Sequence, residues 1–188
     1  MKKENKVNNQ IVALNVTDVI ERLRKGEMSV IASRPAGGKT TLACLIAANA
    51  IQHTPDTAVL YFSLEMPTKQ LCERIRLLAG ENAIQSENLV IDDTAAIDVD
   101  EICQRVKSLK AKKNIQLVIV DYVQLVNCRK RHSEGRQAEI DGIYEMLHEL
   151  ALNQDIAVVV LVRMNRARTS EAPFFGQKCH EFNFAAEW

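Results

Sequence analysis

Residues 33–40, which read Ser-Arg-Pro-Ala-Gly-Gly-Lys-Thr, constrain the fold of this chain more than any other stretch. An apolar run at 28–32 precedes them, and a helical pattern of small and apolar residues follows at 41–51. A strand, a glycine-containing turn and a helix in that order form a unit whose successive backbone N–H groups face an anion. The order predicts an α/β fold with a phosphate site where the first strand ends.

The end of this stretch matches the pattern G-x-x-x-x-G-K-[ST]. Gly38 permits the turn, Lys39 would reach the β and γ phosphates, and Thr40 would offer its hydroxyl to Mg²⁺. Ser33 stands where the pattern has its first glycine, and a small residue can usually make this turn. The alternative is a plain strand-to-helix turn whose lysine points to water. With a nucleoside triphosphate as ligand, the predicted binding residues are Ser33, Arg34, Pro35, Ala36, Gly37, Gly38, Lys39, Thr40 and Thr41.

Composition excludes several other classes of protein. The 188 residues suffice for one domain, and 24 basic against 24 acidic residues leave no net charge to attract nucleic acid or a membrane. The five cysteines are an odd number without a C-x-x-C pair, which argues against a disulfide framework or a zinc site. Because no apolar run approaches the ~20 residues that cross a bilayer, we expect no membrane contact and a cytoplasmic location.

Two further apolar runs, at 58–62 and 115–120, are each followed by an acid. Open α/β sheets bind ligands at the C-terminal ends of their strands, so both acids would face the phosphate site. Glu65 could orient a water molecule against the γ phosphate, or it could be an acid at a helix start that stabilises the helix dipole. Asp121 could hold the water shell of the Mg²⁺ that Thr40 coordinates, which is the Walker B role.

The remaining patterns complete an α/β core with a mostly parallel sheet and helices on both faces. Helices are expected at 70–79, 98–113 and 140–151, the first with Leu78 inward and Arg74 outward, and strands at 89–92 and 156–162. We expect a mobile tail at 1–10, the core at 11–168, and a divergent tail at 169–188 with a possible edge strand at 182–184.

A charged loop at 127–136 follows the strand that carries Asp121. It should emerge at the ligand edge of the sheet, where Arg129, Lys130, Arg131 and Arg136 are candidates for contact with single-stranded DNA. A solvated loop is the alternative. Arg163 ends the last predicted strand and could meet a γ phosphate or DNA. Gln124 is a candidate for nucleotide binding as a polar group at a strand end, with packing as the alternative.

The order of these motifs resembles the C-terminal ATPase domain of DnaB-type replicative DNA helicases, which has a RecA-like P-loop NTPase fold. The match covers roughly residues 21–168 and runs through ASRP at 32–35, GKT at 38–40, FSLEM at 62–66, IDDT at 91–94, IVDYVQL at 119–125, RQAEI at 136–140 and NR at 165–166.

The resemblance implies that Lys39 and Thr40 bind ATP and Mg²⁺, that Glu65 is the catalytic base, and that Asp121 is the Walker B acid. It also implies that the loop ending at Arg136 lines a channel for single-stranded DNA in a hexameric ring. Binding of this kind depends on backbone charge and has no sequence preference.

Three departures limit the resemblance. Arg163 replaces a glutamine that senses the γ phosphate, the stretch after residue 168 does not match the strands that carry the arginine finger, and the N-terminal collar domain has no counterpart. The second hypothesis is therefore an ATP-binding module without hydrolysis that docks on a larger helicase or replication complex. A RecA-fold signalling or recombination ATPase is a third, which the motifs at 63–66 and 121–125 disfavour.

Overall fold

The computed structural model describes residues 16–54, 56–130, 135–164 and 179–183. Its α-helices are α1 (Val16–Ile20), α2 (Lys39–His53), α3 (Thr68–Ala79), α4 (Glu81–Ile84), α5 (Val99–Lys110) and α6 (Arg136–Gln154), with a 3-10 turn η1 (Val123–Leu125). Its strands are β1 (Met28–Ser33), β2 (Ala58–Ser63), β3 (Leu89–Asp92), β4 (Ile115–Asp121), β5 (Ala157–Arg163) and β6 (Cys179–Asn183).

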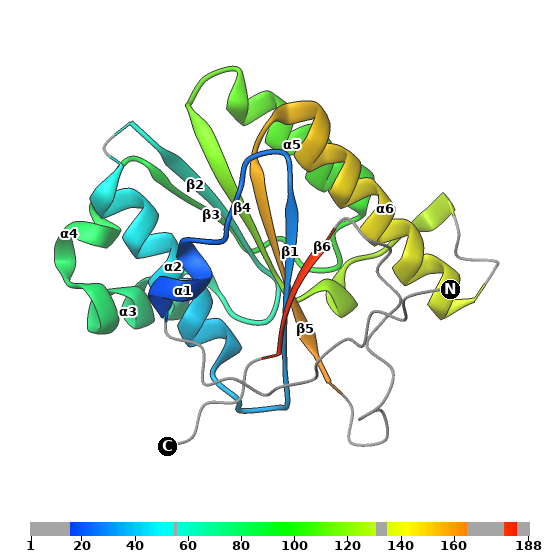
Figure 1. Ribbon diagram of the computed structural model, residues 1–188, viewed down its shortest axis with the longest axis horizontal. Helices are drawn as coiled ribbons and strands as arrows, with labels where there is room; N and C mark the ends of the chain where they lie inside the picture. The colour runs from blue at the N-terminus through cyan, green and yellow to red at the C-terminus, as the bar shows by residue number, and fades with distance from the viewer. Residues whose placement is uncertain (1–15, 55, 131–134, 165–178, 184–188) are drawn as a thin grey trace, which may run out of the picture.

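These strands form a single sheet in the order β3-β2-β4-β5-β1-β6, and every neighbouring pair is parallel. Helices α1 to α4 lie on one face and α5 and α6 on the other (Figure 1). The predicted α/β class, with a parallel sheet between two helical layers, is confirmed.

Strand β4 shows why the central strands read as continuous apolar runs. Val118 and Val120 pack under α5 and α6, whereas Leu117 and Ile119 pack under the helices of the opposite face. Successive side chains of a strand point to opposite faces, so a strand covered on both faces needs apolar residues at every position. This burial fixes the strand register, which places Asp121 at the C-terminal end of β4.

The register brings the ends of four strands together. Ser63 pairs with Asp121, and Ser33 pairs with Arg163. Beyond the paired residues, Leu64 N–H donates to the carbonyl of Asp121 at 2.9 Å and Met164 N–H donates to that of Ser33 at 2.9 Å. The chain segments that leave β2 and β4 therefore begin side by side, as do those that leave β1 and β5.

Several expected details differ from the structure. Leu78, expected to face inward, is 39% exposed, because the buried face of α3 is confined to Leu71 and Ile75. The helix expected at 98–113 ends at Lys110, and the sequence patterns missed α4 and η1. The tail expected at 1–10 lies outside the described residues.

Strand β6 occupies the sheet edge next to β1, in the region where an edge strand at 182–184 was considered. It begins three residues earlier, at Cys179, and residue 184 lies outside the described part of the chain.

Candidate functional site

The loop from β1 to α2 is built on backbone geometry that only small residues allow. Gly38, the residue before α2, has a φ of 81°, in the left-handed region that favours glycine. A Cβ added at Gly37 would lie 3.0 Å from the carbonyl oxygen of Arg34, so a side chain would not fit there without a shift. Ser33 is fully buried, and its hydroxyl donates to the Arg34 carbonyl at 3.1 Å. The serine thus fits within the loop in place of the usual glycine.

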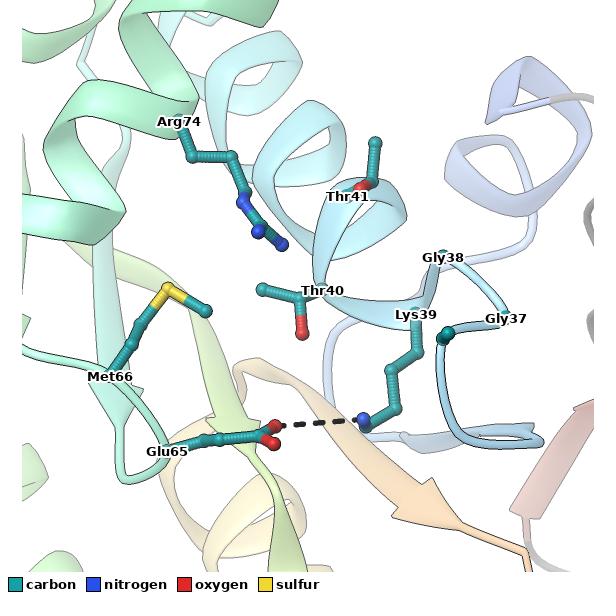
Figure 2. Close-up of a pocket in the computed structure, with 9 residues that line it drawn as sticks. Gly37, Gly38, Lys39, Thr40, Thr41, Glu65, Met66 and Arg74 are labelled. Carbon is teal, nitrogen blue, oxygen red and sulfur yellow. Dashed lines mark ion pairs between the residues drawn. The ribbon is translucent and has the colours of Figure 1, made fainter.

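A cavity of about 420 Å³ lies at the N-terminus of α2 (Figure 2). The first turn of α2 has no acidic residue, and Gly38 provides no side-chain cap. The first N–H groups of a helix lack intrahelical partners, and the helix dipole adds positive potential there. The cavity therefore suits an anion. Its lining residues are Ala36, Gly37, Gly38, Lys39, Thr40, Thr41, Glu65, Met66 and Arg74.

Lys39, which lines this cavity, lies near a carboxylate and an aromatic ring. Its Nζ is 3.7 Å from Oε2 of Glu65 and 5.1 Å from the centre of the Tyr122 ring. The residue is only 7% exposed, whereas the Glu65 side chain is 40% exposed. A buried ammonium is costly unless it is paired, so the carboxylate and the ring stabilise the lysine at this position. The structure brings the predicted lysine and the predicted base together.

Glu65 lies in the segment between β2 and α3, outside the first turn of the helix. The residue that precedes α3 is Pro67, and the first turn contains no acid. Asp93, from the segment after β3, accepts hydrogen bonds from the N–H of Thr68 at 2.7 Å and from its hydroxyl at 2.8 Å. The N–H bond from Thr68 lowers the pKa of Asp93. Asp93 therefore occupies the N-terminus of α3, the role considered as the alternative for Glu65.

Asp121 ends β4 and is 1% exposed. Its Oδ2 accepts a hydrogen bond from the hydroxyl of Tyr61 at 2.9 Å, and its Oδ1 has no partner among the residues that the structure describes. Burial raises the pKa of Asp121, while Thr40, Tyr61 and Lys39 act in the opposite direction. Burial also raises the pKa of Tyr61 well above its ordinary value, so this hydroxyl stays protonated.

The carboxylate of Asp121 and the hydroxyl of Thr40 are suitable ligands for a magnesium ion. Mg²⁺ prefers hard oxygen ligands and usually keeps several waters, with one or two protein groups and substrate phosphates around it. An unpartnered carboxylate oxygen is costly to bury, so a cation or its bound water would satisfy Oδ1. Thr40 belongs to the cavity lining, and its side chain is near enough to the Asp121 carboxyl to lower the pKa of that group. Thr40 and Asp121 are thus the residues that would hold the metal.

Arg74 is a site residue that the sequence patterns missed. It was expected to point outward from α3, yet its side chain extends toward Thr40 and lines the cavity (Figure 2). The available signal was weak: Arg74 lies three residues after the buried Leu71 and directly before the buried Ile75, at the border of the inward face. Helical spacing alone cannot tell whether such a border residue meets solvent or a ligand.

Five predicted nucleotide-binding residues do not line the cavity. Ser33 ends β1, and Arg34 and Pro35 begin the loop that leads to α2. Gln124 and Arg163 lie on the neighbouring strand ends and bond to each other: the Gln124 amide donates to the Arg163 carbonyl at 3.1 Å and accepts from the Arg163 N–H at 3.3 Å. A nucleotide role for these residues stays a prediction.

The charged loop after β4 is paired with acids. Nζ of Lys130 lies 2.8 Å from Oδ1 of Asp100, and this hydrogen bond raises the pKa of Lys130. Arg129 Nε lies 3.8 Å from Oδ2 of Asp98, and its backbone N–H donates to the same oxygen at 3.0 Å.

Arg136 is paired at the other end of the same loop. Its guanidinium contacts Glu139 at 2.7 Å and donates to the Gln124 carbonyl at 2.7 Å. Arg131 lies outside the described residues. None of the helices in the described part of the chain is long and apolar enough to span a membrane.

Sequence comparison extends over most of the chain. The pattern of the family described as the DnaB-like helicase C-terminal domain matches residues 10–89 and 76–174. The replicative DNA helicase DnaB of Geobacillus stearothermophilus is 29% identical over 169 residues, and the replicative DNA helicase DnaC of Bacillus subtilis is 30% identical over 168 residues. These matches include 77% and 76% of this chain but 37% and 36% of the relatives, so the chain spans about a third of their length.

Solved structures show the same fold. One of them, described as an ATPase domain, superposes with a TM-score of 0.70 at 23% identity, covering 89% of this chain and 70% of that one. A DnaB-like replicative helicase, whose structure was studied with its interactions with primase, gives 0.69 at 22% identity, covering 90% of this chain and 48% of that one. The RecA-like class expected from the motifs is thereby confirmed. The chain belongs to the family of DnaB-like helicase C-terminal domains.

Proposed function

We propose that this chain is a Mg²⁺-dependent ATP-binding and ATP-hydrolysing motor domain of the DnaB helicase type, which acts on single-stranded DNA during replication in the cytoplasm. One observation carries the proposal: the cavity at the N-terminus of α2 has Lys39 within 3.7 Å of Glu65, and Lys39 also acts on the buried Asp121, whose Oδ1 accepts no hydrogen bond of normal geometry from the described residues. Family membership supports the ATPase and helicase class.

The triphosphate would bind against the first N–H groups of α2. Lys39 would exchange its partial pairing with Glu65 for the β and γ phosphates, because the phosphates carry more charge than one carboxylate. Release of this pairing would free Glu65 to accept a proton from the attacking water. Mg²⁺, held by Thr40 and Asp121, would supply positive charge against the phosphate oxygens.

The exposure of Glu65 suits this role. A general base must come within hydrogen-bond distance of the water that it activates. A 40% exposed side chain that lines the cavity would be accessible to water and to a γ phosphate bound there. Glu65 is therefore the residue of this cavity best placed to activate water.

The arrangement in the working helicase is part of the proposal. An arginine finger from a neighbouring copy in a hexameric ring can contribute ~10³-fold or more to turnover, so the isolated chain should hydrolyse ATP slowly. Arg129, Lys130, Arg131 and Arg136 would face single-stranded DNA in the channel of the ring. A larger helicase that supplies the missing parts is the other arrangement.

The second candidate is an ATP-binding module without hydrolysis. Its supporting observation is that the backbone of Arg163 is bonded to Gln124. By the resemblance, Arg163 replaces a glutamine that senses the γ phosphate. This candidate keeps the nucleotide site but separates it from movement along DNA.

ATP hydrolysis by the wild type and by Glu65→Gln tests the proposal. Loss of a general base should lower turnover about 10²-fold or more while ATP affinity is retained. Glu73→Gln, on the exposed side of α3 where Glu73 pairs with Arg76, is the matched control and should leave turnover unchanged. ATP binding without any turnover, even with single-stranded DNA added, would favour the binding module. Absence of ATP binding would contradict both candidates.

A further inference from the structure

Tyr61, in the strand next to β4, forms a hydrogen bond with the proposed magnesium ligand Asp121. Tyr61 is fully buried in β2 and donates its hydroxyl to Oδ2 of Asp121 at 2.9 Å. In the β2–β4 register Tyr61 pairs with Ile119, so Asp121, two residues further along, is its diagonal neighbour on the same face of the sheet. The bond therefore joins β2 to the end of β4, where Asp121 is influenced by the cavity residues Lys39 and Thr40.

Because of this hydrogen bond, the two oxygens of the Asp121 carboxylate have different surroundings. Oδ2 is occupied by the tyrosine, and Oδ1 has no partner in the described part of the chain. A carboxylate that can turn about its terminal bond presents either oxygen and loses rotational freedom when a ligand binds. A carboxylate already held through one oxygen presents the other without that cost.

We infer that Tyr61 is a positioning residue that holds Asp121 through Oδ2, so that Oδ1 is presented to the metal ion bound with the nucleotide. The inference rests on the proposed metal role of Thr40 and Asp121 and adds a residue that acts only through Asp121. Partners that orient a metal ligand commonly contribute ten- to a hundredfold to metal affinity.

A purely structural hydroxyl would behave differently. If the bond only satisfied a buried hydroxyl and a buried carboxylate, its removal would lower stability and leave metal affinity unchanged. The two roles can be separated because nucleotide binding can be measured with and without a divalent cation.

The experiment compares ADP affinity in EDTA with ADP affinity in excess Mn²⁺, by titration calorimetry, and takes the ratio as the gain due to the metal. Tyr61→Phe keeps the ring and should reduce this gain about tenfold or more, with the affinity in EDTA unchanged. Tyr144→Phe is the matched control, because Tyr144 is 6% exposed on α6 across the sheet, in the core on the opposite face. It should retain the full gain.

Unchanged gain in Tyr61→Phe overturns the inference, and so does a parallel loss of affinity in EDTA and in Mn²⁺. Asp121→Asn separates this failure from that of the proposed function. If Asp121→Asn loses the gain while Tyr61→Phe keeps it, only the positioning role is wrong. If both variants keep the gain, the metal role of Asp121 is wrong as well.

A measurement on the wild type covers the case in which Tyr61→Phe does not fold. A fully buried, hydrogen-bonded hydroxyl proton should exchange slowly with water and give its own proton resonance. We expect this resonance to shift when Mg²⁺ is added to the ADP complex, because the metal draws charge from the same carboxylate. A resonance that is visible and does not move contradicts the inference.

Discussion

The nucleotide cavity and the charged loop at 127–136 both place cations beyond the ends of parallel strands, but they pair those cations differently. In the cavity, Lys39 is buried and only 3.7 Å from a half-exposed glutamate. In the loop, Arg129 and Lys130 lie at the surface beside Asp98 and Asp100, which belong to the start of α5. The cavity places a buried lysine beside the N–H groups of a helix start, whereas Arg129 and Lys130 of the loop are exposed and lie beside acids.

The difference shows that a cluster of basic residues does not define an anion site. Exposed pairs contribute little to stability and are screened by salt, so the loop can exchange its acids for phosphates at small cost. The cavity lysine differs because it is almost fully buried. Its two neighbours, Glu65 and Tyr122, belong to the segments that follow β2 and β4. Specific binding is therefore expected at the cavity, and only salt-sensitive contact at the loop.

The largest effect is expected from removal of the cavity lysine. Lys39→Ala should weaken ATP binding about 100-fold, since a buried charged hydrogen bond to phosphate is worth roughly 2 to 3 kcal/mol. Lys130→Ala removes the same charge from the loop and should leave ATP affinity unchanged. Titration with a fluorescent ATP analogue measures both. Equal losses in the two variants would contradict the distinction between the regions.

A smaller effect is expected at the base of the loop. Glu139 is 4% exposed, accepts from the Cys128 N–H at 3.0 Å and pairs with Arg136 at 2.7 Å. Glu139→Ala should lower the free energy of unfolding by about 2 kcal/mol, because a buried donor loses its charged partner. Urea denaturation measures this change, with Glu149→Ala on the exposed side of α6 as control. No difference between the variants would mean that the loop is anchored by other contacts.

Arg74 sharpens the comparison from the side of the cavity. If it contacts the phosphates, Arg74→Ala should weaken ATP binding about tenfold, the equivalent of ~1.4 kcal/mol. Arg76→Ala, two residues along α3, removes an arginine that pairs with Glu73 and should have no effect on ATP affinity. The same fluorescence titration applies, and an unchanged affinity in Arg74→Ala would remove this residue from the site.

The smallest effect is expected for DNA. Neutralising Arg129, Lys130 and Arg131 should weaken binding of single-stranded DNA and reduce its salt dependence by roughly 0.7 of a unit of slope per lost phosphate contact. The double variant Asp98→Asn with Asp100→Asn should act in reverse and strengthen binding a few-fold, roughly 1 kcal/mol or less, because it releases paired cations. Fluorescence anisotropy at several salt concentrations measures both changes. Unchanged affinity in every variant would exclude the loop as a DNA contact.

Local sequence was enough for the site residues whose placement follows from neighbours in the chain. Gly38 and Lys39 are fixed by the strand-turn-helix order, and the acids follow apolar runs that end at the sheet edge. Asp98, the first residue of the helix expected at 98–113, caps α5, because its side chain accepts from the N–H of Asp100. In each case a short pattern of residues has one stable local structure.

Contacts between distant segments could not be predicted in the same way. The placement of Arg74 in the cavity depends on how α3 packs against α2, and the pairing of Lys130 with Asp100 joins residues thirty positions apart. The capping of α3 by Asp93 removed an alternative for Glu65 that sequence position alone had left open.

The sequence by itself determined the phosphate loop, the acids that follow two of the strands, and the burial of both sheet faces. These features follow from backbone sterics and side-chain periodicity. The tertiary structure alone decided which charges are paired and which oxygens are left for a ligand. Pairing depends on distances between side chains of different elements, as in the Tyr61 hydroxyl that occupies one oxygen of Asp121 and leaves the other without a described partner.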